Sequence, residues 1–212
     1  MPAFNAFLIS GRAERFPLAA QELESVDIQF HIIPAVYPAD KGTFETAALR
    51  GCFESHLLCL KTARAFPEHA LIMEDDIFFR HDFSDRFPDY LSRIGYLNEW
   101  DMVNFYGSSF PELDLNHLYN FSSFCSHFYL VNRLSLEKVI SLVENKNEVI
   151  DQIYYRAFSA AKLSVWCTAQ QLVMQNIDFE SDLDTTGINY AKEGSASGIY
   201  RSRTLYRKEH CL

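Results

Sequence analysis

The sequence lacks the segments that would carry it into or across a membrane. None of its uncharged runs reaches the roughly 18 apolar residues that a membrane-spanning helix needs. The opening stretch, MPAFNAFLIS, contains no basic residues, and its apolar run is too short for a secretory signal peptide. We therefore expect a soluble, cytoplasmic protein whose contact with the inner face of a membrane is at most peripheral.

Cysteine pairs and the common catalytic motifs are also missing. The five cysteines are widely spaced, without a CxxC pair and without zinc-type clustering with histidine, which fits a reducing compartment better than a disulfide framework. The chain contains no GxSxG elbow, no glycine-rich phosphate loop and no HExxH. These absences argue against the common kinds of hydrolase and against P-loop enzymes.

Basic charge is scarce except near the carboxyl end. The formal net charge is −9, which argues against a nucleic-acid-binding protein because phosphate contacts need a basic face. The last stretch, SGIYRSRTLYRKEHCL, differs from the rest of this acidic chain. It sets four basic residues against the single acid Glu209, and these are Arg201, Arg203, Arg207 and Lys208.

What is present is an aromatic-rich core in a chain of single-domain length. The 212 residues are 48% apolar and 15% aromatic, and a domain of this size buries about 70% of the surface that its unfolded chain exposes. The chain shows no internal repeat and no linker. Residues 1–212 are therefore expected to form one domain, in which 182–212 are a loop-rich, basic tail rich in Asp, Gly, Ser and Thr.

Hydrophobic periodicity predicts alternating strands and helices in the first half. Short apolar, β-branched runs indicate strands, and apolar residues at three- and four-residue steps indicate helices. Their alternation indicates an α/β half with largely parallel strands, whose ligands bind beyond the carboxyl ends of the strands. The predicted strands are 5–9, 28–36 and 70–73, and the predicted helices are 14–23 and 46–66.

The second half has a less regular pattern. Asp151 stands where the N-cap of a helix would be. The stretch GSSFPELDLN, residues 107–116, is rich in turn-forming residues. The predicted helices are 83–94, 135–144 and 152–161, and the predicted strands are 102–105, 127–131 and, as the last strand, 163–167.

The segment ALIMEDDIFF places three adjacent carboxylates, Glu74, Asp75 and Asp76, directly after an apolar strand. Side chains alternate along a strand, so Glu74 and Asp76 are predicted to converge on one cation while Asp75 faces the other way. Oxygen ligands suit Mn²⁺ or Mg²⁺, and such an ion stabilises charge on a leaving diphosphate. The alternative is that the acids are solvated residues at a strand end or cap a turn.

Other candidate site residues each have two interpretations. Arg12 and Arg15 follow the first strand, at the edge where the acids are expected, and either hold a diphosphate or base or are solvated surface. His56 lies on the predicted helix of RGCFESHLLCLK, where hydrogen-bonded packing is the more frequent role of a histidine. Gly51 either permits a close approach of backbone or ligand or marks a turn.

Several stretches match one family in combination: LISGRAER, AVYP, RGCFESHLLCLKTA, ALIMEDDIFF, SHFYLVNRLSLEKVI and VIDQIYY, which span about residues 7–181. Together they resemble glycosyltransferase family 25, which includes bacterial lipooligosaccharide galactosyltransferases and procollagen galactosyltransferases. The resemblance implies a GT-A-like fold, a Rossmann-type nucleotide-binding mixed sheet flanked by helices. It also implies metal-dependent transfer of a sugar, most often galactose from UDP-galactose, to a glycan acceptor such as lipooligosaccharide, with inversion at the anomeric carbon.

The resemblance assigns roles to the three acids. EDD takes the place of a DxD element, so Asp76 would bind Mn²⁺ or Mg²⁺ directly, Glu74 would contact the ribose or the metal shell, and Asp75 would lie near the sugar. Other residues expected to bind the UDP-sugar donor follow the first strand or belong to the family's signature helix, and these are Ser10, Arg12, Arg15, Ser55 and His56.

Inversion requires a general base on the acceptor side. Asp151, in VIDQIYY, matches the family's late aspartate and is the first candidate, with Asp182 and Glu180 as rivals. A helix N-cap is the alternative role of Asp151. Either stacking on sugar rings or plain packing is expected for Tyr106, Tyr129 and Tyr154.

Further alternatives concern the tail and the class of function. The basic tail either contacts an anionic membrane that carries a lipid-linked acceptor, at about 1 kcal/mol per basic residue, or is simply solvated. Family members read like INLDRSxxR where this chain has LISGRAER, and this difference and the short C-terminal part favour a catalytically silent nucleotide-sugar or glycan-binding protein. A metal-dependent phosphohydrolase built on the same acids is a third, weaker alternative.

Overall fold

A computed structural model describes residues 2–105, 117–121, 126–169, 171–176, 178 and 200–201. The strands are β1 (Phe4–Ser10), β2 (Phe30–Pro34), β3 (His69–Glu74), β4 (Ile77–Phe79), β5 (Met102–Asn104), β6 (Leu118–Asn120), β7 (Phe128–Val131), β8 (Val165–Thr168), β9 (Val173–Asn176) and β10 (Tyr200–Arg201). The helices are α1 (Phe16–Ser25), α2 (Ala47–Ala63), α3 (Phe83–Ile94), α4 (Leu136–Val143) and α5 (Ile150–Ser159), with a 3₁₀ turn, η1 (Arg133–Ser135), before α4.

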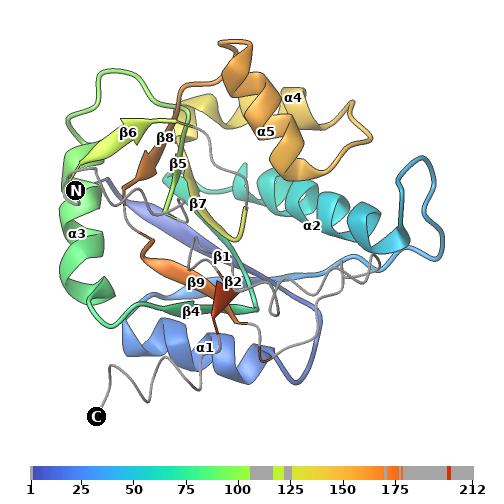
Figure 1. The fold of residues 1–212 in the computed structure, drawn as a ribbon, viewed down its shortest axis with the longest axis horizontal. Helices are drawn as coiled ribbons and strands as arrows, with labels where there is room; N and C mark the ends of the chain where they lie inside the picture. Colours follow the sequence, from blue (N-terminus) through green and yellow to red (C-terminus); the bar gives the residue numbers. More distant parts are fainter. Residues whose placement is uncertain are drawn as a thin grey trace.

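The main sheet of the described residues has the strand order β2-β1-β3-β7-β5-β8-β6 (Figure 1). Strand β1 pairs in parallel with both β2 and β3. Strand β7 lies antiparallel between β3 and β5, and β8 returns parallel to β5. The predicted parallel first half is therefore confirmed, within a sheet that is mixed as a whole.

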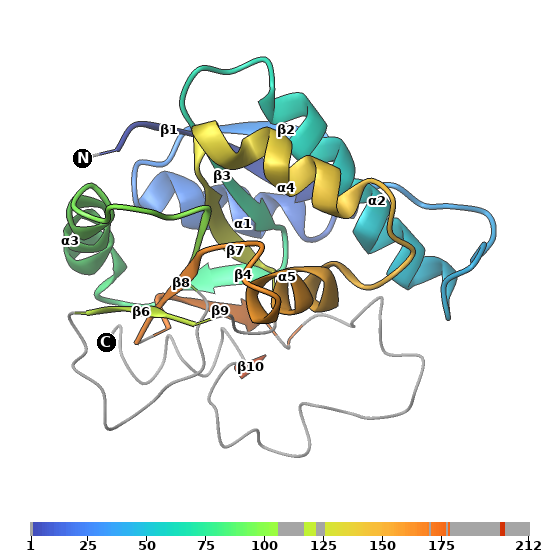
Figure 2. The same ribbon diagram turned by 90° about the horizontal axis from the view of Figure 1, so that it is seen from above.

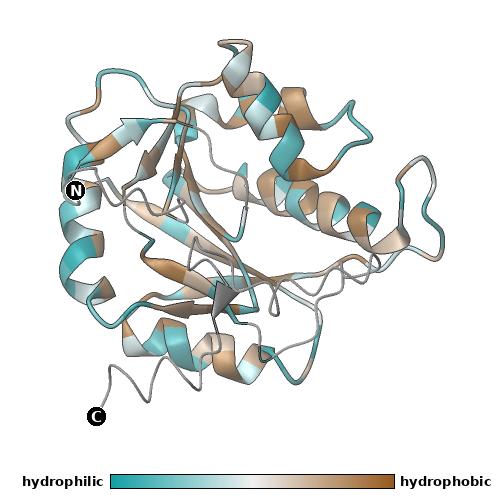
Figure 3. Ribbon diagram, viewed as in Figure 1, coloured by the Kyte–Doolittle hydropathy of each residue, from teal (hydrophilic) through white to brown (hydrophobic). Residues whose placement is uncertain are grey.

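Helices cover both faces of this sheet (Figures 1 and 2). Alternate residues of β1 point to opposite sides, so Phe7 packs in a core with α2, α4 and α5, whereas Leu8 packs in a second core with α1 and α3. The strands at the centre of the molecule are mostly apolar in colour, whereas α1 and α3 carry both apolar and polar segments (Figure 3). Two-sided burial explains why the predicted central strands are continuous apolar runs.

A second, smaller sheet follows directly from the acidic segment. Strand β4 begins one residue after Asp76 and pairs antiparallel with β9, which in turn pairs with β10. The buried carboxylate of Glu22, on α1, accepts a hydrogen bond of 3.0 Å from the backbone N–H of Phe79. The apolar residues after EDD therefore start a separate sheet. Glu74 ends β3, and Asp75 and Asp76 form the turn between the two sheets.

Several sequence-based boundaries need correction. The strand predicted at 28–36 is confined to β2, although the backbone N–H of Ala35 still donates a hydrogen bond of 2.9 Å to the carbonyl of Ser10. The strand predicted last, 163–167, is followed by β9 and β10, and the sequence pattern also missed β4 and β6. Strand β10 falls within the predicted loop-rich tail, and the turn-rich stretch 107–116 lies outside the described residues.

The predicted N-cap role of Asp151 is wrong. Helix α5 begins at Ile150, and its N-cap is Val149, which has an extended backbone and no side-chain hydrogen bond to the helix. Asp151 instead lies in the first turn, where a carboxylate interacts favourably with the helix dipole. Its side chain is therefore not committed to capping.

Among the described residues, no helix is both long and apolar enough to cross a bilayer.

Candidate active site

The three parallel strands end at one pocket of about 330 Å³. Its walls come from the residues after β1, the loop after β2, the first turns of α2 and the acids at the end of β3. In open α/β sheets ligands bind beyond the carboxyl ends of strands, as the sequence led us to expect here. The volume lies within the usual range for small-molecule sites, about 300–1,000 Å³.

Glu74 stands between two histidines at the floor of this pocket. Its Oε1 lies 3.0 Å from Nε2 of His56, and its Oε2 lies 2.9 Å from Nδ1 of His127. Burial by itself would raise the pKa of Glu74, but His127 and His56 lower it well below its usual range. Glu74 is therefore a carboxylate at neutral pH.

One carboxylate oxygen of Asp76 accepts a hydrogen bond, and the other lies near His127. Its Oδ2 accepts a hydrogen bond of 2.6 Å from Nε2 of Gln175 and lies 4.0 Å from the guanidinium of Arg15. Its buried Oδ1 accepts no hydrogen bond from any described residue and lies 3.9 Å from Nδ1 of His127. Burial and the nearby Glu74 raise the pKa of Asp76.

The group formed by Glu74, Asp76 and His127 has the composition of a cation site. Its three ligand atoms all lie within 4.8 Å of one another. A buried carboxylate oxygen that lacks a donor is costly unless a cation or another partner satisfies it. The residues present therefore fit a divalent ion. Glu74 and Asp76 approach each other as predicted, but Asp76 lies in the turn after β3, so alternation along the strand is not the reason.

Asp75 turns toward β1 and is buried. Its Oδ2 accepts hydrogen bonds from Oγ of Ser10, at 2.7 Å, and from the backbone N–H of Gly11, at 3.3 Å. Its Oδ1 lies 3.8 Å from the guanidinium of Arg15. The alternative that Asp75 is a solvated residue at the strand end is therefore wrong. The contacts of Asp75 connect the acidic turn to the end of β1.

The two predicted arginines have different environments. Arg15 is buried against Asp75 and Asp76, so its interpretation as solvated surface is wrong. Arg12 lines the pocket with its side chain 35% exposed, and it lies 3.6 Å from Glu14. Arg15 therefore offsets the charge of the acids, whereas Arg12 is accessible to a ligand in the pocket.

Helix α2 holds the loop after β2 close to the pocket. The Oγ of Ser55 accepts a hydrogen bond of 2.8 Å from Val36 N–H and donates one of 2.6 Å to the carbonyl of Gly51. A Cβ at Gly51 would lie 2.5 Å from the carbonyl oxygen of Val36, so only glycine permits this approach. Of the two interpretations of Gly51, close approach of backbone is the one observed.

His56 is a buried, hydrogen-bonded residue that also borders the pocket. Its Nδ1 lies 2.9 Å from the hydroxyl of Tyr129, which lies 3.3 Å from the hydroxyl of Tyr154. Both tyrosines are buried, so of the two interpretations, stacking on sugar rings and packing, packing is the one observed. They orient His56 toward Glu74, and Tyr106 lies outside the described residues.

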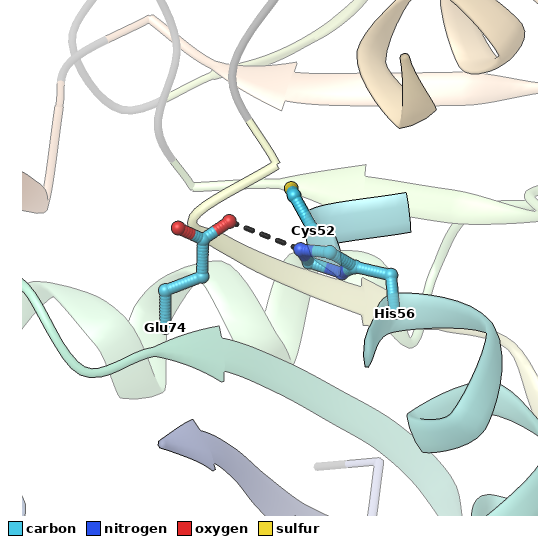
Figure 4. A group of neighbouring side chains, drawn as sticks. All are labelled: Cys52, His56 and Glu74. Atoms are coloured by element: carbon cyan, nitrogen blue, oxygen red, sulfur yellow. Dashed lines mark hydrogen bonds and ion pairs between the residues drawn. The ribbon is translucent and has the colours of Figure 1, made fainter. Parts of the chain in front are cut away.

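Cys52 completes the floor of the pocket, one helical turn before His56. Ligand atoms of Cys52, His56 and Glu74 lie within 4.8 Å of one another, a proximity that the sequence motifs did not indicate (Figure 4). Burial, and then the negative charges of Glu74 and Asp151, raise the pKa of the Cys52 thiol well above its usual value. Asp151 does not line the pocket that the described residues form.

Comparison with known proteins decides the family. A model of glycosyltransferase family 25, described as an LPS biosynthesis protein family, matches residues 5–147. The chain belongs to glycosyltransferase family 25. A search of curated proteins by sequence gave no match.

A solved glycosyltransferase structure shows the same fold at low sequence identity. A glycosyltransferase involved in the glycosylation of the major capsid of PBCV-1 is 12% identical, with a TM-score of 0.51 over 84% of this chain and 95% of that chain. A mutant of Drosophila beta-1,4-galactosyltransferase 7 in complex with manganese, UDP-Gal and xylobiose is 11% identical, with a TM-score of 0.44 over 96% of this chain and 79% of that chain. The predicted GT-A-like mixed sheet is confirmed.

In this family 25 glycosyltransferase, sequence reasoning missed His127 and Gln175. His127 precedes β7, whose antiparallel pairing places it opposite Glu74, and Gln175 lies on β9 opposite Ile77. Both residues reach the acids through strand pairings that local periodicity does not reveal. For His127 the available signal was a histidine at the very start of an apolar strand, in SHFYLV. The rival bases Asp182 and Glu180 lie outside the described residues.

Proposed function

We propose that this glycosyltransferase transfers a hexose, with galactose as the first choice, from a UDP-sugar to a glycan acceptor, with inversion and with the help of Mn²⁺ or Mg²⁺. The observation that carries the proposal is the oxygen Oδ1 of Asp76, which is buried beside Glu74 and His127 without a hydrogen bond from the described residues. It lies at the edge of a pocket of nucleotide-sugar scale, at the carboxyl ends of three parallel strands.

Asp76, Glu74 and His127 are the residues that would hold the divalent ion. When bound, such an ion neutralises negative charge on a leaving diphosphate. Arg15 already offsets the charge of Asp75 and Asp76, which keeps three adjacent acids compatible with one buried turn. The two histidines hold the carboxylate of Glu74, and Gln175 holds that of Asp76, so the proposed ligands are already oriented.

The donor would lie along the strand ends, with its nucleotide toward β1 and β2. Arg12 offers an accessible cation for the diphosphate. Tyr37 lines the same pocket, is 61% exposed and lies over Gly11, so its ring offers a flat face to a nucleobase. Ser10 already hydrogen-bonds to Asp75, and Ser55 to the backbone of Val36. We therefore propose that the main role of both serines is to shape the donor site, and that contact with the donor is secondary.

On the acceptor side, a carboxylate would take the proton of the acceptor hydroxyl as its oxygen attacks the anomeric carbon. Asp151 is our first candidate because it lies in the first turn of α5, the helix whose Tyr154 contacts the hydroxyl of Tyr129, which in turn contacts His56 at the pocket. Asp182 and Glu180 remain rival candidates. We propose a lipid-linked glycan such as lipooligosaccharide as acceptor, which agrees with the family's description as LPS biosynthesis proteins, with the basic tail toward the membrane.

Asp75 would lie near the transferred sugar. This proposal is supported by the contacts of Asp75 with Ser10 and Gly11 at the end of β1, where we propose that the nucleotide binds. The alternative function, a catalytically silent nucleotide-sugar or glycan-binding protein, shares this donor site. It differs only in having no productive base, so donor binding and transfer must be measured separately.

A donor screen tests the proposal. We expect a panel of nucleotide sugars to raise the melting temperature most for one UDP-hexose, only with Mn²⁺ or Mg²⁺, and UDP to be released when a glycan acceptor is added. Stabilisation by the donor without UDP release would favour the silent binding protein. Release of inorganic phosphate from UDP would favour the phosphohydrolase, and stabilisation unchanged by EDTA would contradict the metal-dependent donor site.

A further inference from the structure

The side chains of Cys52 and His56 project from the same face of α2 toward Glu74 at the end of β3, and the dashed line in Figure 4 marks the bond from His56 to Glu74. Residues four apart on a helix lie one above the other, which is why the sulfur and the imidazole share this face. We propose that Cys52, His56 and Glu74 form a second cation site, which binds Zn²⁺ and chemically similar ions through one sulfur, one nitrogen and one oxygen.

The geometry needs only a small adjustment to hold such an ion. Bond lengths of about 2.0–2.3 Å to Zn²⁺ place the ligands of a tetrahedral site about 3.4–3.6 Å apart. The three ligand atoms here already lie within 4.8 Å of one another, and the His56 and Glu74 atoms are 3.0 Å apart. All three residues line the pocket, which leaves room on its side for a fourth ligand such as water.

The donor atoms distinguish this site from the one proposed for the sugar donor. A thiolate and an imidazole select Zn²⁺, Co²⁺ or Cd²⁺, whereas the carboxylate-rich group around Asp76 suits Mn²⁺ or Mg²⁺. The two groups share Glu74 but approach different oxygens, since Oε1 faces His56 and Oε2 faces His127. The proposed site is therefore separate in its chemistry, and its existence does not depend on the proposed transfer reaction.

The surrounding hydrogen bonds allow His56 to become a ligand without leaving a buried group unsatisfied. At present Nε2 donates to the Glu74 carboxylate and Nδ1 accepts from the Tyr129 hydroxyl. With a cation on Nε2, the imidazole proton moves to Nδ1 and is donated to Tyr129, whose own proton is donated to Tyr154. The thiol proton of Cys52 leaves to solvent as the bond from sulfur to the metal forms.

Cobalt substitution tests the site on the full-length protein, without donor or acceptor. We expect Co²⁺ to produce a thiolate-to-cobalt charge-transfer absorption that Zn²⁺ abolishes and Mn²⁺ does not. Cys52→Ser should lose this absorption. Cys59→Ala, which removes a fully buried thiol from the same helix, should keep it. Asp76→Asn should also keep it, which separates this site from the proposed Mn²⁺ ligands.

A second measurement uses only the wild-type chain and so does not depend on the folding of a variant. Saturating Zn²⁺ should protect Cys52 from alkylation by iodoacetamide, as read by mass spectrometry of the Cys52 peptide. The proposal is overturned if the wild-type protein shows no sulfur-to-cobalt absorption, if the absorption survives in Cys52→Ser, or if Zn²⁺ leaves the alkylation of Cys52 unchanged.

Discussion

At the scale of single residues, Gly51 shows how the signature helix shapes the pocket. It lets α2 approach the carbonyl of Val36 more closely than any other residue type allows. Ser55 then ties the same loop to the helix through the backbone N–H of Val36. The position of the loop that carries Tyr37 is thus set by two small residues of α2, neither of which needs to contact a ligand.

Substitution of Gly51 by alanine should destabilise the protein by about 1–3 kcal/mol, the usual cost of overpacking a well-packed site. The new Cβ would meet a backbone oxygen at 2.5 Å, so either the loop or the helix has to move. Urea unfolding followed by circular dichroism measures the loss. Gly95→Ala is the matched control, because its Cβ would lie 3.2 Å from the nearest backbone oxygen, and an equal loss in both variants would refute this explanation.

The second prediction at the scale of single residues concerns Asp151, the proposed general base. Asp151→Asn should lower the rate of transfer by about 10²–10⁴-fold, the usual contribution of a general base, and leave the affinity for UDP unchanged. Asparagine preserves the size of the side chain in the first turn of α5. Initial rates and UDP binding are measured on the same preparation. Intact transfer with weakened UDP binding would rule out Asp151 as the base.

At the scale of elements, sequence patterns identified most helices and strands but not their pairings. The apolar runs of β1, β3 and β7 and the stripes of α2 and α4 follow from local periodicity, because each is buried on a sheet face. The short strands β4, β6 and β9 were not predicted, because the local pattern did not separate them from the turns and loops around them. His127 and Gln175 reach the acids through strand pairings, so local sequence could propose the acids but not these two residues.

One contact between elements gives a pH-dependent stability. Asp101, just before β5, accepts hydrogen bonds from Nζ of Lys138 on α4, at 2.6 Å, and from the backbone N–H of Ser164 before β8, at 2.7 Å. Burial by itself would raise the pKa of Asp101, but these donors and Ser135 together lower it below its usual value. The carboxylate therefore connects three elements at the end of the sheet opposite the pocket.

The sign of the pH effect follows from this lowered pKa. The unfolded chain binds the Asp101 proton more readily than the folded chain, so this contribution to stability is present above about pH 4 and lost as pH falls through the folded-state pKa. An ordinary aspartate titrates between about pH 5 and 3. Over this range we expect the free energy of unfolding to fall less steeply in Asp101→Asn than in wild type. Lys138→Met, which removes the paired charge alone, should also reduce this slope. Identical slopes in all three proteins would contradict the assignment.

At the scale of the whole molecule, the parallel strands and the two sheets together make the proposed donor site. The ends of β1, β2 and β3 supply its walls, the turn between the sheets supplies the acids, and β7 and β9 supply His127 and Gln175. The family and the fold class were accessible from sequence because they rest on motifs and periodicity. The burial of Asp75 and Arg15 and the proximity of Cys52 to His56 and Glu74 were not, because they depend on how distant segments pack.

The central claim is that the group of Asp76, Glu74 and His127 binds a divalent ion that the UDP-sugar donor requires. Isothermal titration calorimetry of UDP into the protein tests it most directly, with Mn²⁺, with EDTA, and with the Asp76→Asn variant. We predict that UDP binds the wild-type protein in Mn²⁺ but binds neither in EDTA nor to a folded Asp76→Asn variant. Equal UDP affinity with Mn²⁺ and EDTA, or wild-type affinity in Asp76→Asn, would contradict this account.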